Sequence, residues 1–80
     1  MNLSDILYEA FEDVLGITKQ EIEDDPQFDL LQNEILDSLS IVSILSFVFK
    51  KTGKEYDIRQ MSGDDFSTFE HFLKALERQQ

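Results

Sequence analysis

The first strong periodic pattern in the chain covers residues 5–15. Apolar residues recur there every three or four positions, which places their side chains on one face of an α-helix. They are Ile6, Leu7, Ala10, Phe11, Val14 and Leu15. Ser4 can cap this helix, because serine side chains accept backbone N–H groups at helix starts. Gly16 is a natural stop. The pattern therefore predicts a helix that begins at Asp5 and ends before Gly16.

Residues 17–36 keep no sustained period. Acidic residues crowd around Ile17 and Ile22, and Pro26 breaks any helix that would continue through it. The later apolar positions are irregularly spaced, at Phe28, Leu30, Leu31, Ile35 and Leu36. A connection of this length inside a compact domain is unusual and often functional. We expect an ordered loop that has room for a short helical turn and whose apolar side chains pack into the core.

From Ser38 to Lys51 most positions are apolar. A strand is a rival interpretation, since many of these residues are β-branched or aromatic. The run is too long for a typical strand, however, and Asp37 with Ser38 can supply a helix cap. Lys50 and Lys51 stand where a helix dipole favours cations, and a glycine follows soon after. These features favour a second helix over this run.

The last third of the chain contains one clear helix. Residues 54–66 leave room for at most one short helix, because their apolar positions are isolated and Gly63 interrupts them. Ser67 and Glu70 then match a capping box. Phe69, Phe72, Leu73 and Leu76 follow at helical spacing. The whole pattern predicts an all-α fold, a four-helix bundle in one domain over residues 1–80, with a long first loop and a short third helix.

Composition narrows the classes of function. Seventeen acidic residues against seven basic ones give a net charge of -10, which repels nucleic acid and anionic membranes and favours partners with basic patches. The chain has no cysteine and a single histidine, so we expect no disulfide and no thiolate or multi-histidine metal site. No apolar run is long enough to span a bilayer, and residues 1–5 lack the basic and apolar parts of a signal peptide. We therefore expect a cytoplasmic protein without stable membrane insertion.

Asp37 and Ser38 are the candidate functional residues of the chain. An Asp-Ser pair ahead of an apolar run is ordinary helix capping, and the pair alone indicates nothing more. Its position between a long loop and a largely apolar helix favours a functional interpretation. His71 lies far along the chain, so no base is expected beside Ser38, and nucleophilic catalysis needs such a base. The serine is therefore a candidate substrate and not a candidate catalyst, and we expect no enzyme activity.

In this context the sequence resembles the acyl carrier protein family over nearly the whole chain. The residues that carry the resemblance are Asp37, Ser38 and Leu39, the Asp-Ser-Leu motif at the start of the second helix. The resemblance implies that a phosphopantetheinyl transferase attaches 4'-phosphopantetheine from coenzyme A to the Ser38 hydroxyl. The arm then carries an acyl or aminoacyl group as a thioester, in fatty-acid-like, polyketide or other specialised biosynthesis. It further implies that Asp37 helps to position the transferase and its metal, and that Leu39 faces the arm or a partner enzyme.

The sequence departs from the family pattern in two places. Many carriers have a glycine shortly before the Asp-Ser pair, but residues 33–36 read Asn-Glu-Ile-Leu. Fatty-acid-type carriers also expose acidic residues along the second helix, where this chain has Ser40, Ser43 and Ser46. We therefore expect partners to dock mainly through apolar contact with Leu39, Ile41, Ile44 or Phe49. The full predicted partner surface is Leu39, Ser40, Ile41, Ser43 and Ile44.

Two alternatives remain open from the sequence. Residues 56–68 resemble the corresponding segment of stand-alone aminoacyl carriers, including D-alanyl carrier proteins, which a dedicated adenylating ligase loads. The other alternative is an unmodified helical adaptor that binds a partner through the exposed part of the second helix. In each case we expect a monomer that works with other proteins.

Overall fold

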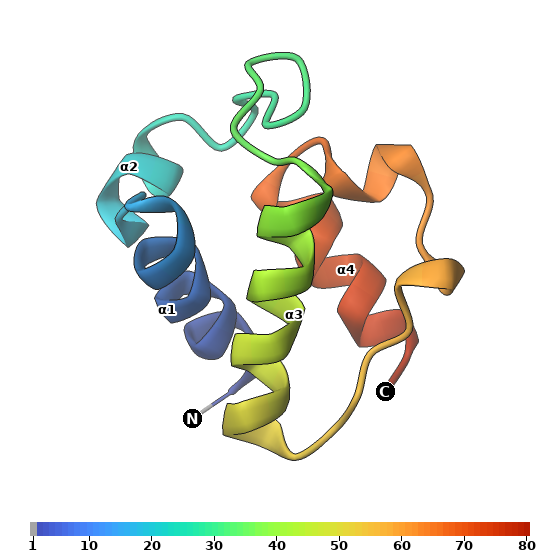
Figure 1. The fold of residues 1–80 in the computed structure, drawn as a ribbon. Coiled ribbons are helices and arrows are strands. Elements are labelled where there is room, and N and C mark those ends of the chain that lie inside the picture. Colours follow the sequence, from blue (N-terminus) through green and yellow to red (C-terminus); the bar gives the residue numbers. More distant parts are fainter. Residues whose placement is uncertain (1) are drawn as a thin grey trace.

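Four α-helices and two short 3₁₀ turns form the structure, a computed structural model that describes residues 2–80. The helices are α1 (Leu3–Leu15), α2 (Lys19–Asp24), α3 (Ser38–Thr52) and α4 (Phe69–Arg78), and the turns are η1 (Ile58–Gln60) and η2 (Gly63–Phe66). Residues 2–80 contain no strand, which confirms the all-α prediction. Figure 1 shows α3 between α1 and α4, with the long loop at the end of the bundle where α3 begins.

Helix α1 begins two residues earlier than the sequence predicted. The Asn2 side chain is the cap, and its Oδ1 atom accepts the backbone N–H of Asp5 at 2.9 Å and the Ser4 hydroxyl at 2.8 Å. The prediction of Ser4 as the cap was wrong, because the Ser4 hydroxyl donates to Asn2 from inside the first turn. At the other end, Gly16 adopts φ 72°, a left-handed conformation that glycine tolerates. The predicted stop at Gly16 is confirmed.

Helix α2 occupies the part of the first connection where the sequence left room for a short helical turn. Thr18 and Glu21 form a capping box, in which the Thr18 Oγ1 atom accepts the Glu21 N–H at 3.2 Å and Glu21 Oε1 accepts the Thr18 N–H at 3.0 Å. Ile22 is the only apolar side chain among the six helical residues. One apolar position shows no period, so only the Thr18-Glu21 spacing could have indicated this helix.

The rest of the long loop is ordered by backbone hydrogen bonds. The Leu30 N–H donates to the Ser67 carbonyl at 2.7 Å, which fixes the loop to the segment before α4. The N–H groups of Ile35 and Leu36 both donate back to the Leu30 carbonyl, at 2.9 and 3.1 Å. Leu30 and Leu36 are buried, as the sequence predicted, but Phe28 and Leu31 expose 40% and 37% of their area, so the prediction that the apolar side chains of this loop pack into the core is wrong for these two. The chain therefore enters α3 from a defined direction.

The segment between α3 and α4 differs from the single short helix that the sequence allowed. It forms the two 3₁₀ turns, with Tyr56 and Phe66 buried in the core and with polar side chains bonded to its backbone. Asp65 is buried, and its carboxylate accepts the Ser62 N–H and an Arg78 guanidinium N–H, each at 2.8 Å. Burial acts to raise the pKa of Asp65, but the hydrogen bonds from Ser62 and Arg78 outweigh it and lower the pKa below its ordinary value.

Thr68, and not Ser67, caps α4. The Thr68 Oγ1 atom accepts the His71 N–H at 3.2 Å, and its backbone is extended, at φ -137° and ψ 165°. Ser67 still has helical angles, φ -72° and ψ -38°, because it continues the η2 turn. An N-cap residue needs extended backbone angles, so the predicted capping box of Ser67 and Glu70 is wrong by one residue.

This difference gives a direct prediction. Thr68→Ala is expected to lower the free energy of unfolding by about 1–2 kcal/mol, since it removes the cap of α4. Ser67→Ala is the comparison: it removes the hydroxyl that contacts Asp64 and His71 but no cap, so it should cost less than Thr68→Ala, about 0.5–1 kcal/mol. Urea denaturation followed by circular dichroism measures both. An equal loss for the two variants, or a larger loss for Ser67→Ala, would place the cap at Ser67 instead.

The core is formed by α1, α3 and α4 around a cluster of aromatic rings. Phe11 lies edge-on to Phe69 and Phe72, with ring centroids 5.1 and 5.8 Å apart, and Phe66 contacts Phe72 at 5.5 Å. Such edge-to-face pairs add to the free energy gained by burial. The largest fully buried side chains are Phe11, Phe72, Leu7, Ile44, Leu76 and Val48. Among the helices of residues 2–80, none combines the length and the apolar character needed to cross a membrane.

Candidate functional site

Ser38 is the first residue of α3 and is exposed to solvent. Figure 1 shows that α3 begins at the end of the bundle from which the long loop enters, so Ser38 lies at this end. The loop approaches it through a compact turn, in which Asp29 Oδ1 accepts the N–H groups of Leu31 and Gln32 at 3.0 and 2.8 Å. Ser38 is therefore held on ordered backbone while its hydroxyl faces solvent.

The turn before Ser38 contains a residue in an unfavourable conformation. Glu34 adopts φ 58°, the one positive φ of a non-glycine residue among residues 2–80. A left-handed conformation favours glycine, and for other residues it typically costs about 1–2 kcal/mol. The sequence drew attention to the absence of a glycine ahead of the Asp-Ser pair. The chain makes a glycine-like turn there with Glu34, four residues before Ser38.

Asp37 caps α3 as predicted. Its carboxylate accepts the Ser40 N–H at 2.8 Å, and the backbone is extended, at φ -127° and ψ 178°. Hydrogen bonds from the backbone and side chain of Ser40 lower the pKa of the Asp37 carboxyl below its ordinary value. Asp37 thus keeps its negative charge beside the Ser38 hydroxyl at neutral pH. At its other end α3 stops at Gly53, which adopts φ 74°.

The exposed face of α3 carries three large apolar side chains among its serines and lysines. Leu39, Val42 and Phe49 expose 75%, 54% and 46% of their area. Together with exposed Ser46 they recur at intervals of three and four residues, which places all four on one side of the helix. We call Leu39, Val42, Ser46 and Phe49 the α3 stripe. The predicted partner surface did not include Val42, although its spacing of three residues from Leu39 could have indicated it.

Two residues of the predicted partner surface are corrected by their burial. Ile41 and Ile44 pack into the core with exposed fractions of 6% and 0%, so they cannot contact a partner. Ser43 is exposed and Ser40 is half-buried, with its N–H bonded to Asp37. The sequence could not separate the two faces, because α3 carries apolar residues all round. Only packing against α1 and the rest of the core decides which of them are covered.

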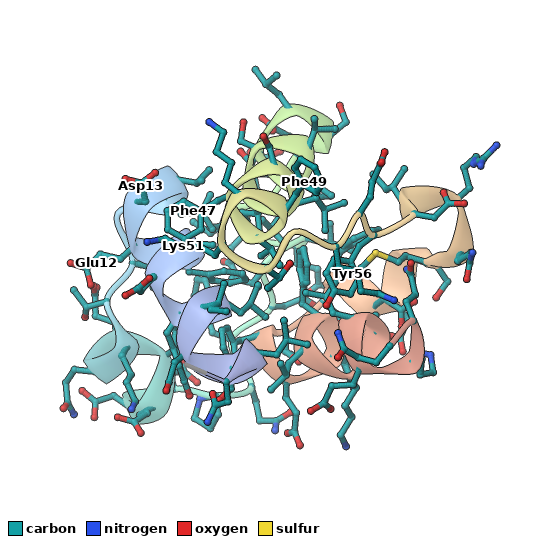
Figure 2. All side chains as sticks on the ribbon, turned by 90° about the horizontal axis from the view of Figure 1, so that it is seen from below. Glu12, Asp13, Phe47, Phe49, Lys51 and Tyr56 are labelled. Atoms are coloured by element: carbon teal, nitrogen blue, oxygen red, sulfur yellow. The ribbon has the colours of Figure 1, made fainter. Side chains whose placement is uncertain are left out.

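The two sides of α3 differ in chemistry near its C-terminal end. Figure 2 shows Phe47 and Lys51 on the side of α3 that faces Glu12 and Asp13, and Phe49 on the opposite side. The Lys51 Nζ atom lies over the Phe47 ring, 5.6 Å from its centroid, and 3.9 Å from a Glu9 carboxylate oxygen. On this side α3 contacts α1, and Lys51 remains exposed. On the other side the α3 stripe carries the exposed large apolar side chains of this helix.

His71 does not lie beside Ser38. It belongs to α4, and its Nδ1 atom is 2.7 Å from the Ser67 hydroxyl oxygen. That hydroxyl also donates to the Asp64 carbonyl at 2.7 Å. The polar contact of the histidine ring is therefore with Ser67 and not with Ser38. Residues 2–80 also contain no group of three or more His, Cys, Asp or Glu side chains arranged to hold a metal ion.

No known protein-family model matches this chain, and neither a curated protein nor a solved structure matches it significantly.

Proposed function

We propose that this protein is a carrier modified on Ser38 by 4'-phosphopantetheine, and that it presents an acyl or aminoacyl group to partner enzymes in the cytoplasm as a monomer. The observation that carries the proposal is the position of Ser38. It is an exposed serine at the first residue of α3, capped by Asp37 and reached through a long ordered loop. A modifying enzyme can reach such a hydroxyl without unfolding any part of the bundle.

The residues at this position fit the attached group. A phosphodiester on Ser38 lies at the N-terminus of α3, where the helix dipole stabilises negative charge. The Ser38 side chain is exposed, so the arm has free access to solvent. When attached, the arm supplies a thiol that holds the cargo as a thioester. Asp37 stays bonded to Ser40 and is the residue expected to position the transferase and its metal.

The α3 stripe supports a specific way of docking. It begins beside Ser38 at Leu39, and α3 contains no acidic residue that could pair with a basic patch. A partner enzyme with an apolar surface can cover Leu39, Val42 and Phe49 and reach Ser38 at the same time. Contiguous exposed apolar residues of this kind mark interaction surfaces. Docking by apolar contact distinguishes this protein from carriers that depend on acidic helices.

The same stripe favours a second candidate function. An unmodified helical adaptor would use the exposed residues of α3 to hold a partner, with Ser38 serving as an ordinary residue of the first turn. In that case Asp37 is only the helix cap. The carrier and the adaptor therefore share a binding surface and differ in the chemistry of Ser38.

Co-expression with a broad-specificity phosphopantetheinyl transferase tests the carrier proposal. We expect the intact mass to increase by one phosphopantetheine group, and Ser38→Ala to lose this increase completely because no other hydroxyl can replace it. Ser62→Ala is the matched control, as an exposed serine outside α3 and the predicted partner surface, and should be modified like the natural chain. Absence of any mass increase, or an increase that survives Ser38→Ala, would reject the carrier and leave the adaptor.

A further inference from the structure

A pocket of about 420 Å³ opens between the end of α1, α2 and the long loop. We call it the loop pocket. Its floor consists of buried side chains, Phe11, Leu30 and Phe69, and its walls are the half-buried Ile17, Ile22 and Ile35. Phe28 also lines it and is exposed. The volume falls in the lower part of the range of small-molecule sites, about 300–1,000 Å³.

The apolar walls of the loop pocket are held in place by polar contacts outside it. The Thr18 capping box fixes the start of α2 and so places Ile22. The hydrogen bond from Ile35 to the Leu30 carbonyl, at 2.9 Å, places the opposite wall. A concave apolar surface that is formed in advance can bind an apolar group without first paying for its own ordering.

Acidic residues line the same pocket, and their charge determines whether it favours a cationic or an anionic ligand. Glu21, Asp24 and Asp25 are lining residues, but the Glu21 carboxylate already accepts the Thr18 N–H and hydroxyl in the capping box, which leaves Asp24 and Asp25 as the charged groups for a ligand. Within residues 2–80 none of the three forms an ion pair with a lysine or arginine; the ion pairs of this part of the chain lie at Glu9, Asp57, Asp65 and Glu70. Asp24 accepts only a neutral amide donor, from Gln20 at 2.9 Å.

The one basic residue between positions 17 and 36 does not neutralise this group. Lys19 places its Nζ atom over the Tyr8 ring, 5.1 Å from the centroid, and Lys19 is not part of the pocket lining. An anionic ligand would therefore meet uncompensated negative charge, in a chain whose net charge is already -10. A ligand with a positive end would be attracted to the same carboxylates.

We propose that the loop pocket binds a small amphipathic organic cation, an apolar body that fills the space between Ile17, Ile22 and Ile35 with an ammonium group held near Asp24 and Asp25. The inference goes beyond the carrier function and does not require that Ser38 be modified. Such a group has two possible sources. It is either a free amine or a cationic cargo attached at Ser38, three residues after Ile35.

Three probes of similar length separate the effect of an apolar chain on binding from the effect of the charge at its end. Hexylamine, hexanol and hexanoate present the same kind of aliphatic chain with a positive, neutral and negative end. In ¹H–¹⁵N NMR titrations we expect hexylamine to shift the amides of Ile17, Ile22 and Ile35, hexanol to bind more weakly at the same residues, and hexanoate to leave them unchanged. Added salt should weaken hexylamine and not hexanol. Equal binding of hexylamine and hexanol, no binding of hexylamine, or shifts confined to other residues would overturn the proposal.

A pair of single-charge variants tests the carboxylates. Asp25→Asn should weaken hexylamine binding by about two- to fivefold, the effect of one partly exposed ion pair, and leave hexanol binding unchanged. Glu23→Gln removes the same charge from the adjacent helix α2 but lies outside the pocket lining, so it should have a smaller effect. If the two variants weaken hexylamine equally, overall charge and not the pocket selects the cation, and the proposal fails.

A tethered probe distinguishes the two sources. The natural chain has no cysteine, so Ser38→Cys creates a single attachment point for a thiol-reactive aminoalkyl chain. Shifts at Ile17, Ile22 and Ile35 in the tethered protein, matching those with free hexylamine, would support a cationic cargo attached at residue 38. Shifts with free hexylamine alone would support a free amine as the ligand. Ser38→Cys carries no phosphopantetheine in this experiment, so its outcome is separate from the test of the carrier function.

Discussion

Phe72→Ala is expected to lower the free energy of unfolding by about 3–5 kcal/mol, the loss typical of a fully buried phenylalanine. Phe72 is fully buried in α4, and its ring contacts Phe11 and Phe66 edge-on. Removal of the ring deletes these contacts and leaves a cavity at the point where α1, α4 and η2 meet. The surrounding elements are held by caps and hydrogen bonds, so they can close this cavity only in part.

The size of the protein makes this loss severe. A chain of 80 residues is stable by only about 4–12 kcal/mol in total, so the variant should be substantially unfolded or close to it at room temperature. Urea denaturation followed by circular dichroism measures the change. Leu39→Ala is the matched control, since Leu39 is largely exposed, and should change the free energy by no more than about 0.5 kcal/mol. Similar losses for the two variants would contradict the core described here.

Leu39→Glu is expected to slow modification of Ser38 by a phosphopantetheinyl transferase by about 10- to 100-fold. This prediction rests on the proposed carrier function. A fully buried leucine contributes about 1.5–3 kcal/mol, and each 1.4 kcal/mol corresponds to a tenfold change in affinity. Leu39 is the most exposed large apolar residue of α3 and lies next to Ser38, so a docked enzyme would cover it. The measurement is the second-order rate constant, obtained from intact mass against time.

Leu39→Lys separates apolar docking from electrostatic docking. If partners dock by apolar contact, Glu and Lys at position 39 should slow the reaction to a similar extent, and the rate for the natural chain should depend little on salt. If partners dock through a basic patch, Leu39→Glu should speed the reaction, Leu39→Lys should slow it, and salt should reduce the rate strongly. The second pattern would contradict the role proposed for the α3 stripe. Circular dichroism of each variant verifies that α3 remains folded.

The sequence predicted the ends of helices correctly where only one nearby residue could cap the helix or adopt a left-handed backbone conformation. Asp37 caps α3 and Gly16 and Gly53 end two helices, as predicted, because side-chain capping and left-handed turns depend on a few adjacent residues. The same reasoning placed Ser38 at a helix start. The prediction failed at the start of α4, because Ser67 and Thr68 are neighbours and each has a hydroxyl group that can cap a helix. Ser67 follows the η2 turn directly and keeps helical backbone angles, which leaves Thr68 as the cap.

The sequence by itself determined that this chain is an all-α domain in which Ser38 opens a capped helix, because helical periodicity and capping are local properties. Only the tertiary structure decided what surrounds that serine. Ile41 and Ile44 face the core, while Leu39 and Val42 face solvent, since packing against α1 and the rest of the core covers one side of a helix that is apolar all round. The loop pocket likewise exists only in the folded chain. Its walls come from separate segments that no local pattern connects, and packing alone brings them together.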